Sequence, residues 1–131
     1  MKYRIVEVTE NGERYYIIEK KILFFWKELC IKDISYINEG YNDIITTMKL
    51  KFNTQYEAEE VIKDYKTIKY KNIIINPFIN PFNKVDYYIK YNNKHNKIKF
   101  EIGNIDYLKS YIDKMISRTT IVKRVVKVID T

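Results

Sequence analysis

The sequence predicts an α+β protein made of two antiparallel β-meander-plus-helix units packed as one compact protein. Three observations support this fold class: an Asn-Gly turn between two β-rich runs, a strand, capping box and amphipathic helix in residues 48–65, and a second strand-then-helix stretch in residues 97–115. The 131 residues suit one domain or two small halves with a shared core. We expect an order βββ(β)α in residues 1–66, a connector in residues 67–84 and an order ββαβ in residues 85–131.

Residues 3–8 and 14–20 are predicted to form the first hairpin. Asn11-Gly12 favours a type I′ turn, which needs positive φ at both central positions. That turn places Val8 opposite Tyr15, and Arg4 opposite Glu19. The last two side chains can then form a cross-strand ion pair.

Residues 22–31, ILFFWKELCI, are predicted to form the third strand. Trp26 is expected to anchor the core, because a large aromatic side chain buries much area. The alternative is an exposed binding patch of Trp26 with Phe24 and Phe25. Cys30 is expected to be a small core residue. Residues 33–37 and 43–52 then flank a hairpin loop at 38–42.

Residues 48–65 supply the first helix. Thr54 stands three residues before Glu57, which is the spacing of a capping box. Helical spacing then gives one apolar stripe, made of Ala58, Val61, Ile62 and Tyr65. The acids in the first turns match the positive end of the helix dipole, so we interpret this helix as scaffold and not as a metal or acid–base site.

Residues 75–82 repeat Ile-Asn-Pro-Phe twice in tandem. Proline has no amide donor and restricts the residue before it, so this segment is predicted to be neither an interior helix nor a central strand. We expect a structured connector in which Phe78 and Phe82 pack inward.

The C-terminal half is predicted to hold a hairpin, a helix and a strand. Residues 85–91 and 97–102 flank the hairpin loop, and Asn104 is placed to cap a helix over residues 105–117. The apolar stripe of that helix is Ile105, Leu108, Ile112, Met115 and Ile116. Residues 119–129 are rich in Val and Ile and predict a final strand, with a terminal helix as the alternative.

Several classes of site are disfavoured by composition. The one histidine, His95, lies in a predicted loop, and the one cysteine is Cys30, so neither a His/Cys metal cluster nor a Ser-His-Asp or Cys-His site is expected. No Gly-rich phosphate loop can be built from three glycines. We expect no cofactor. No apolar stretch has the length of a signal peptide core or a membrane span, so we expect a cytoplasmic protein with no membrane partner.

The net charge of +7 is unevenly distributed. Residues 1–66 hold 11 Lys and Arg against 12 Asp and Glu, whereas residues 67–131 hold 13 against 5. Such asymmetry predicts an anionic partner for the basic half. Tyrosines interleaved with lysines can stack bases and neutralise phosphates. The candidate residues are Tyr88, Lys90, Tyr91, Lys94, Lys97, Lys99, Lys123, Arg124 and Lys127.

One resemblance concerns residues 1–66. Tyr3-Arg4-Ile5-Val6-Glu7, Tyr15-Tyr16-Ile17, Phe24-Phe25-Trp26 and Phe52-x-Thr54-x-x-x-Ala58-Glu59-x-x-Ile62 together resemble small uncharacterised proteins of A/T-rich bacteriophages and their hosts. The resemblance implies a β-meander-plus-helix module, a mobile-element origin and a bacterial host cytoplasm. It implies no activity.

Three functions follow as hypotheses. The first is a non-enzymatic phage or mobile-element accessory protein that binds nucleic acid or a nucleotide through its basic C-terminal half. The second is a protein–protein interaction module, which either inhibits a host defence protein or serves as a structural phage subunit, and a basic half beside a near-neutral half also permits homo-oligomers. The third is an enzyme, such as a small ribonuclease without histidine or metal, for which the sequence holds no motif.

Overall fold

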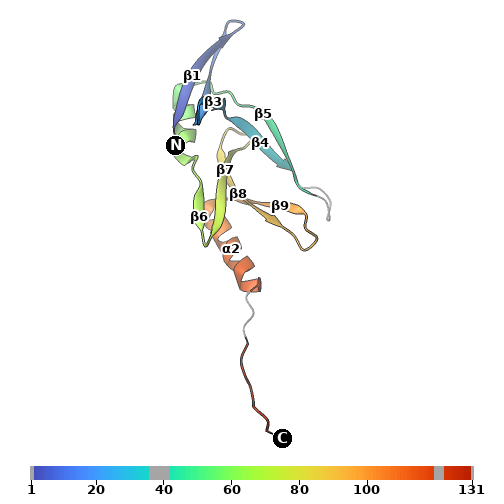
Figure 1. Cartoon of the computed structure of the whole chain (residues 1–131). Coiled ribbons are helices and arrows are strands. Elements are labelled where there is room, and N and C mark those ends of the chain that lie inside the picture. The colour runs from blue at the N-terminus through green and yellow to red at the C-terminus, as the bar shows by residue number, and fades with distance from the viewer. Residues whose placement is uncertain (1, 36–41, 120–122, 131) are drawn as a thin grey trace.

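The computed structural model describes residues 2–35, 42–119 and 123–130, which form an α+β fold (Figure 1). A three-stranded sheet has the order β1-β2-β3, and a six-stranded sheet has the order β5-β4-β7-β8-β9, with β6 beside β7. Pairing is antiparallel except between β4 and β7. The elements are β1 (Tyr3–Glu10), β2 (Glu13–Ile22), β3 (Phe25–Glu28), β4 (Cys30–Ser35), β5 (Ile44–Lys49), α1 (Gln55–Asp64), β6 (Ile68–Tyr70), β7 (Ile73–Ile79), β8 (Val85–Asn92), β9 (Ile98–Gly103) and α2 (Ile105–Thr119).

The first hairpin has the predicted register. Val8 lies opposite Tyr15, and Arg4 lies opposite Glu19 with 2.7 Å between Nε and Oε1. Asn11 and Gly12 both have positive φ, as a type I′ turn requires. Local turn chemistry therefore determines how β1 meets β2.

The third strand is not continuous, so its prediction over residues 22–31 is wrong. Leu23 and Phe24 form a tight turn, after which β3 folds back on β2 with Phe25 opposite Ile22. At Leu29 the chain passes from the first sheet to the second, and the Leu29 amide donates to the Ile18 carbonyl at 2.8 Å. Trp26 is half-buried, and Arg4 Cζ lies over its ring, 4.2 Å from the ring centroid. The prediction that Trp26 anchors the core is therefore wrong.

The first helix forms as predicted, and β4 and β5 form a hairpin, but β4 begins at Cys30 and β5 ends at Lys49, so the predicted strands over residues 33–37 and 43–52 have the wrong bounds. Pairing runs from Cys30 opposite Lys49 to Ser35 opposite Ile44, although residues 36–41 of the connecting loop lie outside the described residues. Cys30 is half-buried and does not belong to the core. At α1 the Glu57 amide donates to Thr54 Oγ1 at 3.2 Å. The α1 stripe buries Ala58 and Val61 in a core that contains Ile18, Leu29, Leu50 and Phe52.

The predicted connector instead contributes β6 and β7, and β7 lies between β4 and β8. Pro77 pairs with Tyr87 of β8, contrary to the expectation that proline excludes a central strand. On the other side of β7, pairing with β6 ends at Ile75 and pairing with β4 occurs at Ile79, so position 77 has no paired neighbour there. One-sided pairing explains why proline is tolerated at this position. Strand pairing thus crosses both predicted boundaries, at residues 66 and 84.

The two copies of Ile-Asn-Pro-Phe, residues 75–78 and 79–82, have different structures. Phe78 is buried as predicted, but Phe82 is 83% exposed in the β7–β8 turn. There Asn80 Oδ1 accepts from the amides of Phe82 and Lys84 at 2.9 and 3.1 Å. The second Asn-Pro-Phe therefore forms a turn and leaves its aromatic ring in solvent.

Strands β8 and β9 form the predicted hairpin. Helix α2 begins at Ile105, directly after the predicted cap residue Asn104. The Tyr107 amide donates to Asn104 Oδ1 at 2.8 Å, and Leu108 and Ile112 are fully buried against β7 and β8. Ile116, at the end of the stripe, is exposed. Helix α2 extends to Thr119, and residues 123–130 are exposed without regular structure, so neither a final strand nor a terminal helix is found there. The observed order in residues 85–131 is therefore ββα, not ββαβ. Apolar composition alone does not supply residues 123–130 with a neighbouring strand to pair with.

The six-stranded sheet curls until its two ends meet. The Asp43 amide donates to the Ile98 carbonyl at 3.0 Å, and the Phe100 amide donates to Asp43 Oδ2 at 3.0 Å. These bonds connect the segment before β5 to the outer edge of β9. The concave face encloses a small core of Ile34, Phe78 and Phe100, flanked by Ile45, Tyr88, Ile98 and Ile102.

Candidate anion-binding cleft

The predicted candidates on β8 and β9 lie on both faces of the sheet. Tyr88 and Lys90 share the concave face, whereas Tyr91 and Lys99 pair directly on the face that α2 covers. The hairpin therefore does not gather these side chains into one surface.

Some of these candidates have structural partners. Lys99 Nζ lies 3.3 Å from Asp43 Oδ1, and the two side chains are 14% and 0% exposed. The Tyr91 hydroxyl accepts from the Tyr111 hydroxyl at 3.3 Å, and burial is the main cause that raises the pKa of Tyr91. Lys94 is exposed and Lys97 is half-buried in the turn that follows β8.

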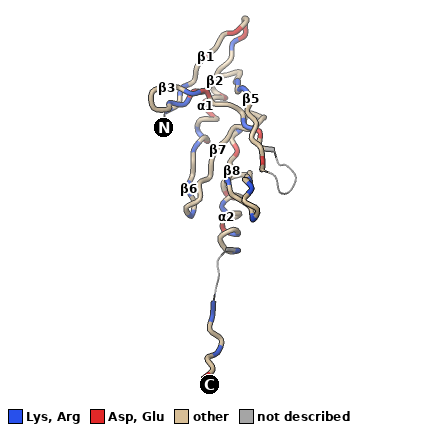
Figure 2. The backbone as a smooth tube through the Cα atoms, turned by 45° about the vertical axis from the view of Figure 1, so that its right-hand side comes forward, with Lys and Arg blue, Asp and Glu red and all other residues tan. Residues whose placement is uncertain are grey.

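Lys123, Arg124 and Lys127 are exposed in the tail, which leaves α2 away from both sheets (Figures 1 and 2). They do not extend the surface of the β8–β9 hairpin. The C-terminal charge excess is therefore divided between separate parts of the molecule.

A different set of basic and aromatic side chains does converge. A cleft of about 520 Å³ opens between the three-stranded sheet, the end of α1 and the concave face of the six-stranded sheet. This volume is in the range of small-molecule sites. Its lining residues are Tyr3, Lys20, Lys32, Tyr65, Lys66, Thr67, Asn76, Pro77 and Tyr88. Tyr88 is the one predicted candidate among them.

Strand register determines how the cleft is assembled. Lys20 lies opposite Tyr3 in the β1–β2 pair, and Asn76 lies opposite Tyr88 in the β7–β8 pair. Lys32 lies two residues before Ile34 on β4, so both point to the concave face. Lys66 and Thr67 follow directly after α1. The cleft is thus the mouth of the curled sheet, with lysines on three sides.

Aromatic packing fixes the tyrosines that line the cleft. Tyr88 meets Phe78 and Phe100 edge-on, with ring centroids 5.7 and 5.5 Å away. Tyr65 meets Tyr3 in the same manner at 6.0 Å. Edge-to-face pairs of this kind add about 0.5–1.5 kcal/mol to the area that they bury. The rings are therefore held in place before any ligand arrives.

The electrostatics of the cleft favour an anion. No carboxylate lines it, and within the described residues Lys20, Lys32 and Lys66 form no ion pair. Burial, with smaller effects of Tyr3 and Tyr88, raises the pKa of Tyr65 to about 12, and burial also raises the pKa of Tyr3 and of Tyr88. At neutral pH these tyrosines are uncharged hydroxyl donors beside three cations.

Sequence reasoning missed Lys20, Lys32 and Lys66 because they lie in residues 1–66, where the net charge is slightly negative. Among the described lining residues, all three lysines come from residues 1–66 and none from the basic half. The alternation of β4, with Lys32 two residues before an apolar Ile34, is the one local signal that places a lysine on a core-facing side.

In the described part of the chain, no three His, Cys, Asp or Glu side chains converge as metal ligands. Among the same residues, neither helix is long and apolar enough to cross a membrane. Comparisons of the chain with models of protein families, with curated proteins and with solved structures found no match.

Proposed function

We propose that the protein is a non-enzymatic binder of a small anionic ligand of the nucleotide class, which occupies the cleft between the two sheets. The observation that carries this proposal is the convergence of Lys20, Lys32 and Lys66 with three tyrosines in a cleft whose described lining includes no carboxylate. The ligand is thus still an anion, as the sequence predicts, but we place it at the mouth of the curled sheet and not on the basic C-terminal half.

Cleft size supports a nucleotide over a duplex or a long single strand. About 520 Å³ suits a mononucleotide or a single nucleotide at the end of a strand. Three ammonium groups can neutralise a phosphate chain, and each charge-assisted hydrogen bond contributes about 1.5–3 kcal/mol. Thr67 and Asn76 add polar groups that can bind a sugar or a base edge.

Isothermal titration with ATP, GMP and inorganic pyrophosphate across a salt series tests the proposal. Substituting Lys20, Lys32 and Lys66 by alanine together should weaken binding at least 100-fold, since each tenfold loss corresponds to about 1.4 kcal/mol. Lys90→Ala/Lys94→Ala is the matched control, because these lysines are exposed on the hairpin outside the cleft. It should leave the affinity unchanged.

Two outcomes would contradict the proposal. Equal loss of affinity in the control would return the site to the β8–β9 hairpin. Absence of binding to every probe at low salt would remove the anionic-ligand function altogether. Phage origin and a bacterial host remain predictions, and the proposed function is compatible with both.

A further inference from the structure

The β2–β3 turn carries the most exposed apolar cluster of the two sheets. Leu23, Phe24 and Phe25, here named the tip, are 82%, 99% and 56% exposed. They are consecutive, and in Figure 2 the turn projects from the side of the molecule beside the label β3. Single exposed apolar residues are ordinary, but a contiguous aromatic cluster marks an interaction site. Phenylalanine is one of the residues that are enriched in the buried core of protein–protein interfaces.

Backbone strain and charge at the tip also favour a partner. Leu23 has φ +48°, in the left-handed region that glycine normally occupies in this kind of turn. Lys20 lies directly opposite Lys27, whereas Lys21 lies opposite Trp26 on the other face of the strand pair. Like charges directly opposite each other destabilise a strand pair. A negatively charged surface would relieve this repulsion while it covers the tip.

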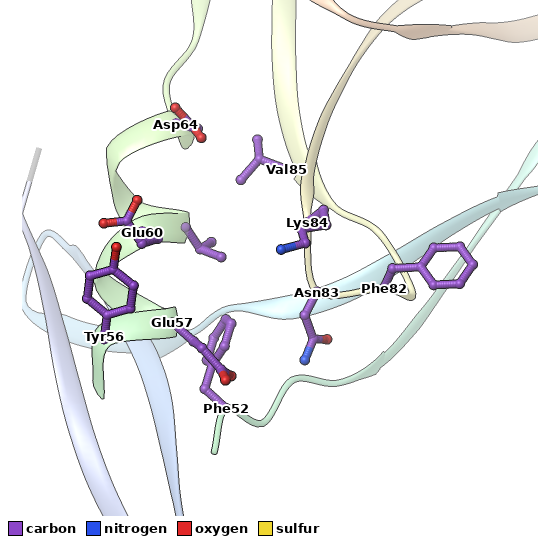
Figure 3. A pocket seen from close by; sticks show the side chains of 10 residues that line it. Phe52, Tyr56, Glu57, Glu60, Asp64, Phe82, Asn83, Lys84 and Val85 are labelled. Atoms are coloured by element: carbon purple, nitrogen blue, oxygen red, sulfur yellow. The ribbon is translucent and has the colours of Figure 1, made fainter. Parts of the chain in front are cut away.

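The same chain offers a groove of matching chemistry. A space of about 530 Å³ lies between α1 and the β7–β8 turn. Phe52, Val61 and Val85 supply apolar lining, and Glu57, Glu60 and Asp64 project from α1 along one edge (Figure 3). Tyr56 and Phe82, which are 67% and 83% exposed, flank it. Lys84 is the one lysine among the described lining residues, and Lys63 of α1 pairs with Glu60 at 2.7 Å.

We propose that the tip of one copy inserts into the α1 groove of a second copy, with Lys27 beside the acids of α1. The tip cannot fill the groove of its own chain, because β3 is paired with β2 from Ile22 opposite Phe25 to Glu19 opposite Glu28 and holds Phe24 in solvent. Tip and groove are different surfaces, so the contact is heterologous. Such contacts build rings or open chains and not closed two-fold dimers.

Sedimentation velocity and light scattering over a concentration series test this association. The wild-type protein should grow beyond a dimer as concentration rises, and higher salt should reduce its size. Phe24→Ser should abolish the growth without a change in melting temperature, because the Phe24 side chain is almost wholly exposed. Val126→Ser, which removes an 84% exposed apolar side chain from the tail, is the control and should associate as the wild type does.

Two further variants separate an interface from a structural role. Leu23→Gly should raise the melting temperature, since glycine tolerates positive φ, and should weaken association at least tenfold, since an apolar contact is lost. Lys27→Asp and Asp64→Lys should each weaken association, and their combination should restore part of it.

Three results would overturn the proposal: a wild-type protein that stays monomeric at high concentration, association that survives Phe24→Ser, or loss of association in Val126→Ser. Binding of monomers to anionic lipid vesicles through Phe24 would equally assign the tip to another occupant. Nucleotide affinity, measured on the same Phe24→Ser sample, should be unchanged, so failure of this proposal and failure of the cleft function remain distinguishable.

Discussion

Asp43 connects the two ends of the curled sheet, and its replacement by alanine should destabilise the whole fold. Its side chain is fully buried and accepts from the Phe100 amide at 3.0 Å and from Lys99 Nζ at 3.3 Å. Removing the carboxylate leaves a buried amide and a cation that is 14% exposed without this partner. The Asp43 amide can still donate to Ile98, so the loss is confined to the side chain.

The expected cost in unfolding free energy is about 3–5 kcal/mol. A hydrogen bond to a charged group contributes about 1.5–3 kcal/mol, and breaking a buried ion pair from one side costs about 3–5 kcal/mol in total. That is a large part of the 5–15 kcal/mol that stabilises a typical domain.

Urea denaturation followed by circular dichroism measures this cost. Asp33→Ala is the control, because Asp33 is exposed on β4 and its backbone carbonyl, not its carboxylate, accepts from Thr46. Its free energy of unfolding should stay within about 0.5 kcal/mol of the wild-type value. Lys99→Met in the Asp43→Ala background should recover part of the loss by removing a largely buried cation that no longer has the Asp43 carboxylate beside it. A cost below 1 kcal/mol for Asp43→Ala would refute the closure of the sheet at this residue.

Three further predictions concern stability. Because the pKa of Tyr65 is raised to about 12 in the folded protein and is about 10 when unfolded, the unfolded state loses this proton first. The free energy of unfolding should therefore fall between pH 10 and 12, and less steeply in Tyr65→Phe; identical slopes in alkaline urea titrations would contradict this. Asn104→Ala should cost about 1 kcal/mol in thermal denaturation through loss of the α2 cap, and no change would argue against that bond. Deleting residues 123–131 should leave the melting temperature unchanged, since residues 123–130 are exposed; a clear decrease would show that the tail contributes to stability.

Features that depend on neighbouring residues were predictable from the sequence. The Asn11-Gly12 turn determined the β1–β2 register, and the Thr54 and Asn104 caps marked the starts of both helices. Each of these is one short-range interaction whose partners lie within a few residues. The α+β class follows from them.

Features that depend on distant pairing were not predictable in this way. Pro77 lies inside the sheet because the strands on its other side do not reach that position, which no local pattern reports. Residues 123–130 have the composition of a strand, but they pair with no strand in the described structure. The cleft joins Lys20, Lys32 and Tyr88 from three strands that are far apart in the chain, so charge counts over halves could not locate it.

An amide nitrogen–proton correlation titration by nuclear magnetic resonance, with ATP and pyrophosphate as probes, tests the central proposal most directly. If the ligand binds in the cleft, the largest chemical-shift changes should occur at Lys32, Thr67, Asn76 and Tyr88, and they should saturate. Changes gathered instead at residues 93–97 or in the tail, or growing linearly without saturation, would contradict a ligand site in the cleft.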